Sequence, residues 1–433
     1  MTKKTSQTVW ILIGLVLGII AGYMISTSFP DKASAVKIAG YVSIISDIFL
    51  RLIKMLIGPL VFSTLVIGIA HMGDSGAVGR VFLKAMAWFI TASIVSLTLG
   101  LVLANLMEPG VNINLPLPPV GTATGLSADH FTIRDFIQHM VPRSFFEAMA
   151  TNEILQIVVF SLLVGTAAAA LGERARTLVS AIDGLASIML KMTGYVMKLA
   201  PFAVFSAMAS TVATNGLAIL AKFALFMLEF YIALGLLWVL LIAAGGFFLG
   251  KRVFHLLGLI KEPFLLSFAT ASSEAAYPKL LDALERFGVN RKIGSFVLPL
   301  GYSFNLDGSM MYCTFATLFV VQAYDIHLSL ATEITMLAIL MLSSKGMAGV
   351  PRASLVVIAA TLNQFNIPEA GLLLILGVDT FLDMGRSATN AVGNSLSAAV
   401  VAKWEGELLD EDAALAHAAE MDLIAGRAAR QTG

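Results

Sequence analysis

Residues 379–394 of this sequence, DTFLDMGRSATNAVGN, are its most informative segment. Five polar residues recur in it at spacings of four, three, four and four, and we call them the polar stripe: Asp379, Asp383, Arg386, Asn390 and Asn394. At about 100° per residue, all five lie within about 80° on one face of an α-helix. An ionisable group at the centre of a bilayer costs about 2.5–3.5 kcal/mol. The stripe must therefore face protein, water or a ligand, and it marks the predicted functional wall.

The rest of the composition is that of a polytopic membrane protein. Hydrophobic residues fill 58% of 433 positions and charged residues 13%, which would leave a soluble protein too little polar surface. Apolar runs of about 20 residues span a bilayer as helices, whereas a β-barrel shows alternating segments of about ten. We therefore expect an all-α protein in a lipid bilayer. The net charge of zero gives no indication of a nucleic-acid partner.

Eight segments are predicted to cross the membrane: 8–29, 43–70, 80–107, 152–171, 178–209, 217–249, 291–323 and 368–402. The basic residues near their ends fall on one side, among them Lys3, Lys4, Arg80, Arg174, Arg176, Lys251, Arg252, Arg291, Lys292 and Lys403. Cytoplasmic loops carry the excess of lysine and arginine. We thus expect both termini in the cytoplasm, and the plasma membrane (the inner membrane of a bacterium) as the location.

Two further apolar segments, residues 255–285 and 333–364, are interrupted by small and polar residues. Each has two arms of about ten to twelve residues, too short to cross a bilayer singly. We predict re-entrant helical hairpins, one on each side of the membrane, each followed by a span with polar groups. This is an inverted repeat, and irregular backbone at membrane depth is tolerated where it lines a cavity.

The seventh predicted span contains a polar and flexible run, residues 305–309 (NLDGS). A helix opened there would free backbone carbonyls, which suit a hard monovalent cation together with Asp307 and the amide oxygen of Asn305. The bound cation would neutralise the buried carboxylate. The alternative is a flexible kink in which Asp307 pairs with Arg386.

In the polar stripe, Arg386 offers a planar fork for a carboxylate and Asp383 an acceptor for an ammonium group. The pair suits an acidic amino acid, and the alternative is an internal salt bridge between them at i, i+3. Ser272 and Ser273, at the first hairpin tip, add hydroxyl and N–H donors that favour an anion. Asp379 is expected to be a structural or loop-facing group.

Several other classes of protein and site are disfavoured. There is no P-loop motif, and histidine is absent from the last two spans and the hairpin tips, which counts against a histidine proton relay and a membrane hydrolase. The single cysteine, Cys313, is expected to pack. The acidic tail after Trp404 is expected to be a solvated helix or a disordered end. An anion channel beside Arg386 is a more distant alternative.

The order and spacing of residues 305–309, 343–351 and 383–394 resemble the dicarboxylate/amino acid:cation symporter family. The resemblance implies a homotrimer with an elevator-type mechanism. Residues 1–252 would be mainly scaffold and trimerisation helices, with the third span contributing to the transport unit. Residues 253–403 would form the core transport unit, and residues 404–433 the acidic cytoplasmic tail. It implies no enzyme activity and no cofactor beyond the coupling Na⁺ or H⁺.

The resemblance also assigns roles to residues of this chain. The substrate would be a small anion, and the residues that bind it would be Ser272, Ser273, Ser309, Val350 (through its backbone), Asp383, Arg386, Ser387 and Asn390. The residues that serve the monovalent coupling cation would be Gly301, Ser303, Asn305, Asp307, Ser344, Asn390 and Asn394.

Several positions depart from the pattern of the sodium-coupled aspartate transporters. Asn394 replaces a carboxylate, while Phe89 and Ala92 replace a tyrosine and a threonine. Each change removes an oxygen ligand or a negative charge, which favours coupling to fewer sodium ions, or to protons instead. Asn394 and the sequence of residues 272–274 (SSE) look more like the C4-dicarboxylate carriers, whereas Asp383 looks like the amino acid transporters. We predict uptake of L-glutamate or L-aspartate, with C4-dicarboxylates as the alternative; Glu274 and Arg352 are gate residues or solvated ends.

Overall fold

The computed structural model describes residues 7–29, 31–70, 75–111, 117–118, 138, 140–344 and 353–431. Its regular elements are helices, and one isolated antiparallel bridge joins Val289 to Leu408. The predicted all-α class is therefore confirmed for the part of the chain that the structure describes.

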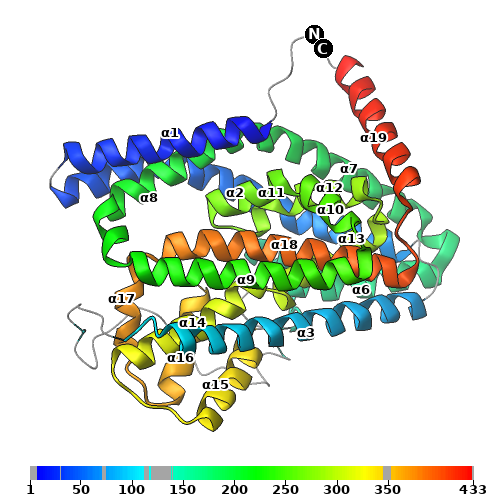
Figure 1. The fold of residues 1–433 in the computed structure, drawn as a ribbon. Coiled ribbons are helices and arrows are strands. Elements are labelled where there is room, and N and C mark those ends of the chain that lie inside the picture. The colour runs from blue at the N-terminus through cyan, green and yellow to red at the C-terminus, as the bar shows by residue number, and fades with distance from the viewer. Residues whose placement is uncertain are drawn as a thin grey trace.

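Figure 1 shows the arrangement of these helices. The first half of the chain contains α1 (Gln7–Ser28), α2 (Lys32–Ala70), α3 (Ser75–Met107), α5 (Phe145–Thr151), α6 (Ile154–Leu171), η1 (Gly172–Ala175), α7 (Arg176–Val196), η2 (Met197–Leu199), α8 (Ala200–Lys222) and α9 (Ala224–Leu249). The second half contains α10 (Arg252–Leu259), α11 (Lys261–Thr270), η3 (Glu274–Ala276), α12 (Tyr277–Phe287), α13 (Arg291–Phe304), α14 (Asp307–Ala323), α15 (Leu330–Ser343), α16 (Ala353–Gln364), η5 (Glu369–Gly371), α17 (Leu372–Leu376), α18 (Asp379–Glu405) and α19 (Glu411–Gln431).

Six stretches of the described chain are long and apolar enough to cross a membrane: Val9–Ser28, Ala33–Ala70, Gly76–Met107, Ile154–Thr214, Ala224–Leu249 and Arg291–Ala323. The predicted span 217–249 begins too early, because residues up to Lys222 continue α8 and the next helix, α9, begins at Ala224. The predicted span 368–402 divides into η5, α17 and α18, and the polar stripe makes α18 less apolar than the others. These spans and the prediction thus agree in most regions but differ in where segments end.

The helix that carries the stripe lies inside the molecule. α18 packs against α9, α11, α13 and α14, and Figure 1 shows it running through the middle of the ribbon. α1 and α2 pack instead against α8, and α2 also contacts α6 and α7. Nearly every residue of α18 is buried, including the stripe residues except Asp383. The prediction that the polar wall faces protein rather than lipid is confirmed.

Both predicted hairpins consist of short helical arms. In the first, α10 and α11 form one bent arm with an angle of 51° between them, and α12 forms the other. In the second, the arms are α15 and α16, while the tip at 345–352 lies outside the described residues. At 1.5 Å per residue, α11 and α12 are each only about half as long as a bilayer core is thick.

The predicted opening of the seventh span is confirmed. α13 ends at Phe304 and α14 begins at Asp307, so Asn305 and Leu306 lie outside both helices. Their backbone is non-helical, with φ/ψ of −123°/62° and −99°/60°. Asn, Asp and Gly favour such a break, because the first two compete for backbone hydrogen bonds and glycine is flexible. The break lies opposite the stripe, since both α13 and α14 pack on α18.

Candidate functional site

Asn390 joins the polar stripe to the first turn of α14. Its Oδ1 accepts hydrogen bonds from the backbone N–H groups of Gly308 (2.9 Å) and Ser309 (3.4 Å), and its Nδ2 lies 3.1 Å from Ser309 Oγ. These N–H groups lie in the first turn, where a helix has no carbonyl partner of its own to offer. Gly308 permits the contact, because a Cβ there would lie 2.6 Å from the carbonyl oxygen of Arg386.

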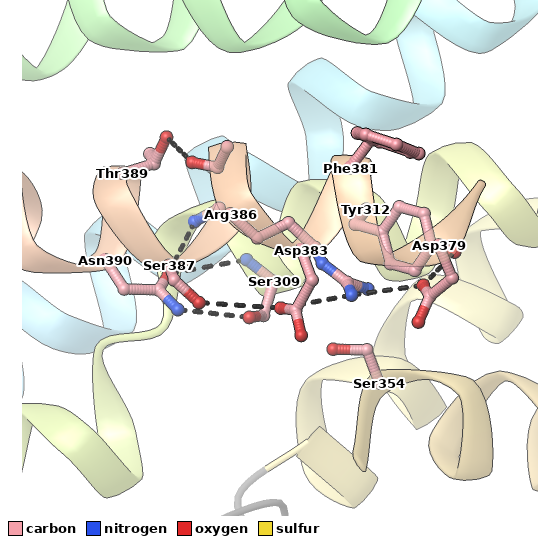
Figure 2. Close-up of polar contacts among 12 residues, drawn as sticks. Ser309, Tyr312, Ser354, Asp379, Phe381, Asp383, Arg386, Ser387, Thr389 and Asn390 are labelled. Carbon is pink, nitrogen blue, oxygen red and sulfur yellow. Dashed lines mark hydrogen bonds and ion pairs between the residues drawn. The ribbon is translucent and has the colours of Figure 1, made fainter. Parts of the chain in front are cut away.

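Arg386 forms the centre of a buried ionic cluster (Figure 2). Its Nη2 lies 3.1 Å from an oxygen of Asp379 and 3.1 Å from an oxygen of Asp383. Tyr312 of α14 donates a hydrogen bond of 2.9 Å to the same Asp379 oxygen. The guanidinium carbon also lies 3.9 Å from the centre of the Tyr312 ring. One cation is thus held by two carboxylates and an aromatic face.

The structure corrects the prediction for Asp379. The loop-facing alternative is wrong, because Asp379 is 2% exposed and contacts both Arg386 and Tyr312. The structural alternative holds. The spacing of seven between Asp379 and Arg386 was a usable signal, since it returns to nearly the same helix face. The salt bridge between Asp383 and Arg386, considered as an alternative to a substrate pocket, is present.

The cluster still has unused binding capacity. Arg386 is 1% exposed, yet its Nε and Nη1 have no hydrogen-bond partner among the residues that the structure describes. The side chain of Asp383 is 33% exposed, whereas that of Asp379 is 3% exposed. Ser387 donates to Asp383 over 3.5 Å. Arg386 and Asp383 therefore present donors and an acceptor side by side, while Asp379 is buried with one oxygen bonded to both Arg386 and Tyr312.

A second polar constellation surrounds the break between α13 and α14. Asn305 Nδ2 donates to Asn394 Oδ1 over 3.0 Å, which joins the break to the end of the stripe. Asn305 Oδ1 and Ser303 Oγ are buried without a hydrogen-bond partner in the described part of the chain. Asp307, which is close to both residues in the sequence, is completely buried. These oxygens are the ligand type that hard cations prefer, and they fit a monovalent coupling ion.

Two glycines let this constellation form. A Cβ on Gly301 would collide with the side-chain oxygen of Asn394, and a Cβ on Gly393 would collide with a carboxylate oxygen of Asp307. The carbonyl of Gly301, a predicted cation ligand, accepts the N–H of Asn305 over 2.8 Å. α13, α14 and α18 can therefore approach closely enough to bring these oxygens together.

The sodium:dicarboxylate symporter family model matches residues 8–404 of this chain. The chain belongs to the sodium:dicarboxylate symporter family. A proton/sodium-glutamate symport protein from Bacillus caldotenax is 37% identical over 417 residues, covering 94% of this chain and 97% of the relative. A C4-dicarboxylate transport protein from Anaeromyxobacter sp. (strain K) is 40% identical over 414 residues, covering 94% and 92%. One from Azorhizobium caulinodans is 39% identical over 409 residues, covering 93% and 89%.

The resemblance drawn from the motifs is therefore confirmed. As a member of this symporter family with several long apolar helices, the chain is an integral membrane protein. The family is one of transporters.

The hairpin tips of the symporter are described only in part. Ser272 Oγ accepts the N–H of Ala275 over 3.3 Å, and no hydrogen bond links Ser272 or Ser273 to the stripe within the described residues. Glu274 begins η3 and is half-buried, so it is not a solvated end. Ser344 Oγ donates to the carbonyl of Met341. The predicted roles of Val350 and Arg352 fall outside the described residues.

Sequence reasoning missed several groups at the site. Tyr312 of α14 and Ser354 of α16 come from apolar helices and stood out by no motif. Figure 2 draws both in its close-up of the cluster. From α9, Tyr231 donates to the carbonyl of Phe381 (2.6 Å) and Trp238 to Thr389 Oγ1 (2.9 Å). These two bonds fix α18 to α9, which also packs on α14 through contacts such as that between the rings of Phe230 and Tyr312. No local sequence pattern signals them.

Proposed function

We propose that this symporter couples the inward movement of Na⁺, H⁺ or both to the uptake of acidic amino acids, L-glutamate or L-aspartate. One observation carries the proposal: the buried Arg386 has two donors without hydrogen-bond partners in the described chain, next to the partly exposed carboxylate of Asp383. The guanidinium donors suit a substrate carboxylate, and Asp383 suits the α-ammonium group.

The charges of the cluster favour an amino acid over a simple dianion. One guanidinium faces two carboxylates, those of Asp379 and Asp383, so the ionised cluster carries a net negative charge. A dicarboxylate would bring two more negative charges into a poorly solvated site. An acidic amino acid also brings a positive charge that can lie against Asp383, and its binding therefore costs less.

A C4-dicarboxylate such as succinate, fumarate or malate is the second candidate. Two of the relatives described above are named C4-dicarboxylate transport proteins. The residues Ser272, Ser273 and Glu274, together with Asn394, also favour that substrate class. Under this alternative a proton or a cation would have to compensate Asp383.

For the coupling ion, we propose a site built from Asn305, Asp307, Asn390 and Asn394 with backbone oxygens near Gly301 and Ser303. The support is the pair of buried oxygens on Asn305 and Ser303 that lack hydrogen-bond partners among the described residues. Asn394 is neutral, so this site is less negative than a comparable site with a carboxylate. Protons in place of some sodium ions are consistent with that change.

We further propose a homotrimer with eight spans, cytoplasmic termini and an elevator-type movement of residues 253–403 against a scaffold from residues 1–252. The packing of α1 and α2 chiefly on α8 supports this division, while contacts of α2 with α13 and of α1 with α11 cross its boundary. α3 contributes to the moving unit through its packing on α14. The hydrogen bonds from α9 to α18 favour placing α9 in the moving unit as well.

Uptake into proteoliposomes tests the proposal. Purified protein should accumulate radiolabelled L-aspartate or L-glutamate against its gradient when Na⁺ or H⁺ is more concentrated outside. Arg386→Ala should abolish this uptake, since the substrate carboxylate loses its cationic partner. Wild-type affinity in that variant would refute the role of Arg386.

Two comparisons distinguish the alternatives. Succinate uptake that excess aspartate does not inhibit would favour the C4-dicarboxylate function. Anion currents without saturable, concentrative uptake would favour an anion channel.

A further inference from the structure

The chain after α18 turns back onto the cytoplasmic end of the first hairpin. Val289, just after α12, and Leu408 form an antiparallel bridge. Leu409 donates its N–H to the carbonyl of Gly288 (2.9 Å), and Asn290 donates its N–H to the carbonyl of Glu407 (3.1 Å). The Asn290 side chain also donates to the Glu407 carboxylate over 2.7 Å. The tail thus adds a short strand pairing to the hairpin.

Two arginines attach the same segments from the hairpin side. Arg252, at the start of α10, donates to the carbonyl of Leu409 (2.9 Å) in the tail and to that of Phe287 (3.0 Å) in the hairpin. Arg286 of α12 pairs with Asp422 of α19 at 2.8 Å. A single guanidinium therefore joins both arms of the hairpin to the tail, and a second ion pair lies further along α19.

The start of α19 also packs on the hairpin. Ala414 is 5% exposed, and Ala418 and Met421, which follow at helical spacings of four and three, are less exposed than their neighbours. Gly288 has a φ of +99°, and a Cβ on it would lie 2.9 Å from the Cβ of Ala414. Of the two expectations for the tail, a solvated helix or a disordered end, the described residues show the helix. Its acidic residues are exposed as expected, but its opposite face packs on the hairpin.

The other end of this segment is fixed to α18 and α3. Lys84 of α3 donates to the carbonyl of Trp404 and pairs with Glu405, both at 2.7 Å. The end of α18 is therefore anchored immediately before the chain crosses to the hairpin. Direct contacts therefore connect the end of α18 to α3, and the tail that follows α18 to the residues just after α12.

We propose that residues 406–431 are a brace that positions the first hairpin on α18 throughout transport, with Arg252 and Arg286 as positioning residues. α11 and α12 are short arms, and α12 ends in a turn at Gly288. The brace holds that turn to the end of the stripe helix, so that the hairpin and the stripe move as one body. The statement about transport rests on the function proposed above.

A disulfide between Val289→Cys and Leu408→Cys tests whether the brace stays closed. The two residues form a non-hydrogen-bonded antiparallel pair, whose Cα atoms are about 4.5 Å apart, within the range for a disulfide. The only native cysteine, Cys313, is buried. The disulfide should form on mild oxidation and leave at least about half of the uptake. Loss of uptake on oxidation with recovery on reduction would show that the tail must release, which contradicts the brace.

A second test measures hairpin opening without any substrate. In a Ser272→Cys background, we compare the rate of maleimide labelling at the tip with and without Asp422→Arg, which places two arginines against each other. The rate should rise about two- to fivefold, because local opening becomes easier. Adding Arg286→Asp to Asp422→Arg should restore the slower rate.

The matched control is Glu173→Arg, which repels Arg176 in an exposed pair remote from the hairpin and should not change labelling. Removal of residues 407–433 should raise the rate by about tenfold or more. If neither Asp422→Arg nor the deletion changes labelling, the brace is refuted. Because this readout needs no transport, failure of the proposed substrate or ion would leave it interpretable.

Discussion

At the level of single residues, the cluster around Arg386 contains one fully buried carboxylate and one partly exposed carboxylate, the one that we propose binds the substrate. Asp379 is buried and receives bonds from both Arg386 and Tyr312, whereas Asp383 is partly exposed. If Arg386 had only one carboxylate partner, that partner would neutralise it while the site is empty. A substrate that displaced the partner would then leave the guanidinium without a protein counter-ion. With Asp379 as a permanent partner, Asp383 can turn towards a ligand while Arg386 stays compensated.

Replacement of the exposed carboxylate should change substrate choice. Asp383→Asn removes the charge that would pair with an ammonium group, so the apparent affinity for aspartate or glutamate should fall by about tenfold or more. Succinate, which has no such group, should bind as well or better. Competition in proteoliposome uptake measures both, and Asp325→Asn, at an exposed turn, is the control. Equal losses for all substrates would contradict the assignment of Asp383.

The hydroxyl of Tyr312 should stabilise the buried cluster. Tyr312→Phe keeps the ring against Arg386 but removes a donor to Asp379, which should lower the free energy of unfolding by about 1–3 kcal/mol. Thermal unfolding in detergent detects this as a lower Tm. Tyr324→Phe removes a hydroxyl that bonds the carbonyl of Pro118 at a less buried position, and its smaller effect provides the comparison.

At the scale of elements, close packing of α13, α14 and α18 creates the second constellation. Gly301, Gly308 and Gly393 lie where any side chain would meet a neighbouring helix or its polar groups. The break at Asn305 and Leu306 then directs polar groups into the space between these helices. A cation site at this position depends on the distance between helices as much as on the ligands themselves.

Small side chains at these glycines should disturb ion binding. Gly301→Ala and Gly393→Ala push against Asn394 and Asp307, which are both fully buried and have little room to move. Overpacking of this kind costs about 1–3 kcal/mol. We expect a higher Na⁺ concentration for half-maximal uptake, or a higher proton requirement. Gly184→Ala, where a Cβ meets nothing within 4 Å, is the matched control and should behave as wild type.

At the scale of the whole molecule, polar groups are concentrated around α18 while the outer helices remain apolar. α1 exposes many large apolar side chains, as expected of a surface in lipid, and α18 is enclosed by α9, α11, α13 and α14. This arrangement lets one helix carry charged and amide groups at membrane depth without exposing them to hydrocarbon.

The energy source of transport is a property of the whole molecule. We expect concentrative uptake to require an inward cation gradient and to stop when an ionophore collapses it. The test compares the rate of uptake driven by an imposed Na⁺ gradient with the rate driven by an imposed H⁺ gradient in sodium-free buffer. Equal rates with H⁺ alone would show that sodium is dispensable, in keeping with Asn394 in place of a carboxylate.

Sequence patterns alone were enough to predict the membrane-embedded helical class, the polar wall of α18, the break at Asn305 and the two short-armed hairpins. Each follows from local properties, namely composition, the helical period and the conformational preferences of Asn, Asp and Gly. The family resemblance added the expected roles of these residues.

The partners of the polar groups, in contrast, became known from the folded structure. The cluster of Asp379, Tyr312 and Arg386, the anchoring bonds from α9 and the docking of the tail on the first hairpin join residues far apart in the chain. Which surfaces meet depends on the packing of whole helices, and a residue such as Tyr312 has the same local pattern whether it packs against lipid, a helix or a guanidinium. Long-range ion pairs therefore follow from the assembled fold and not from the spacing of residues along one helix.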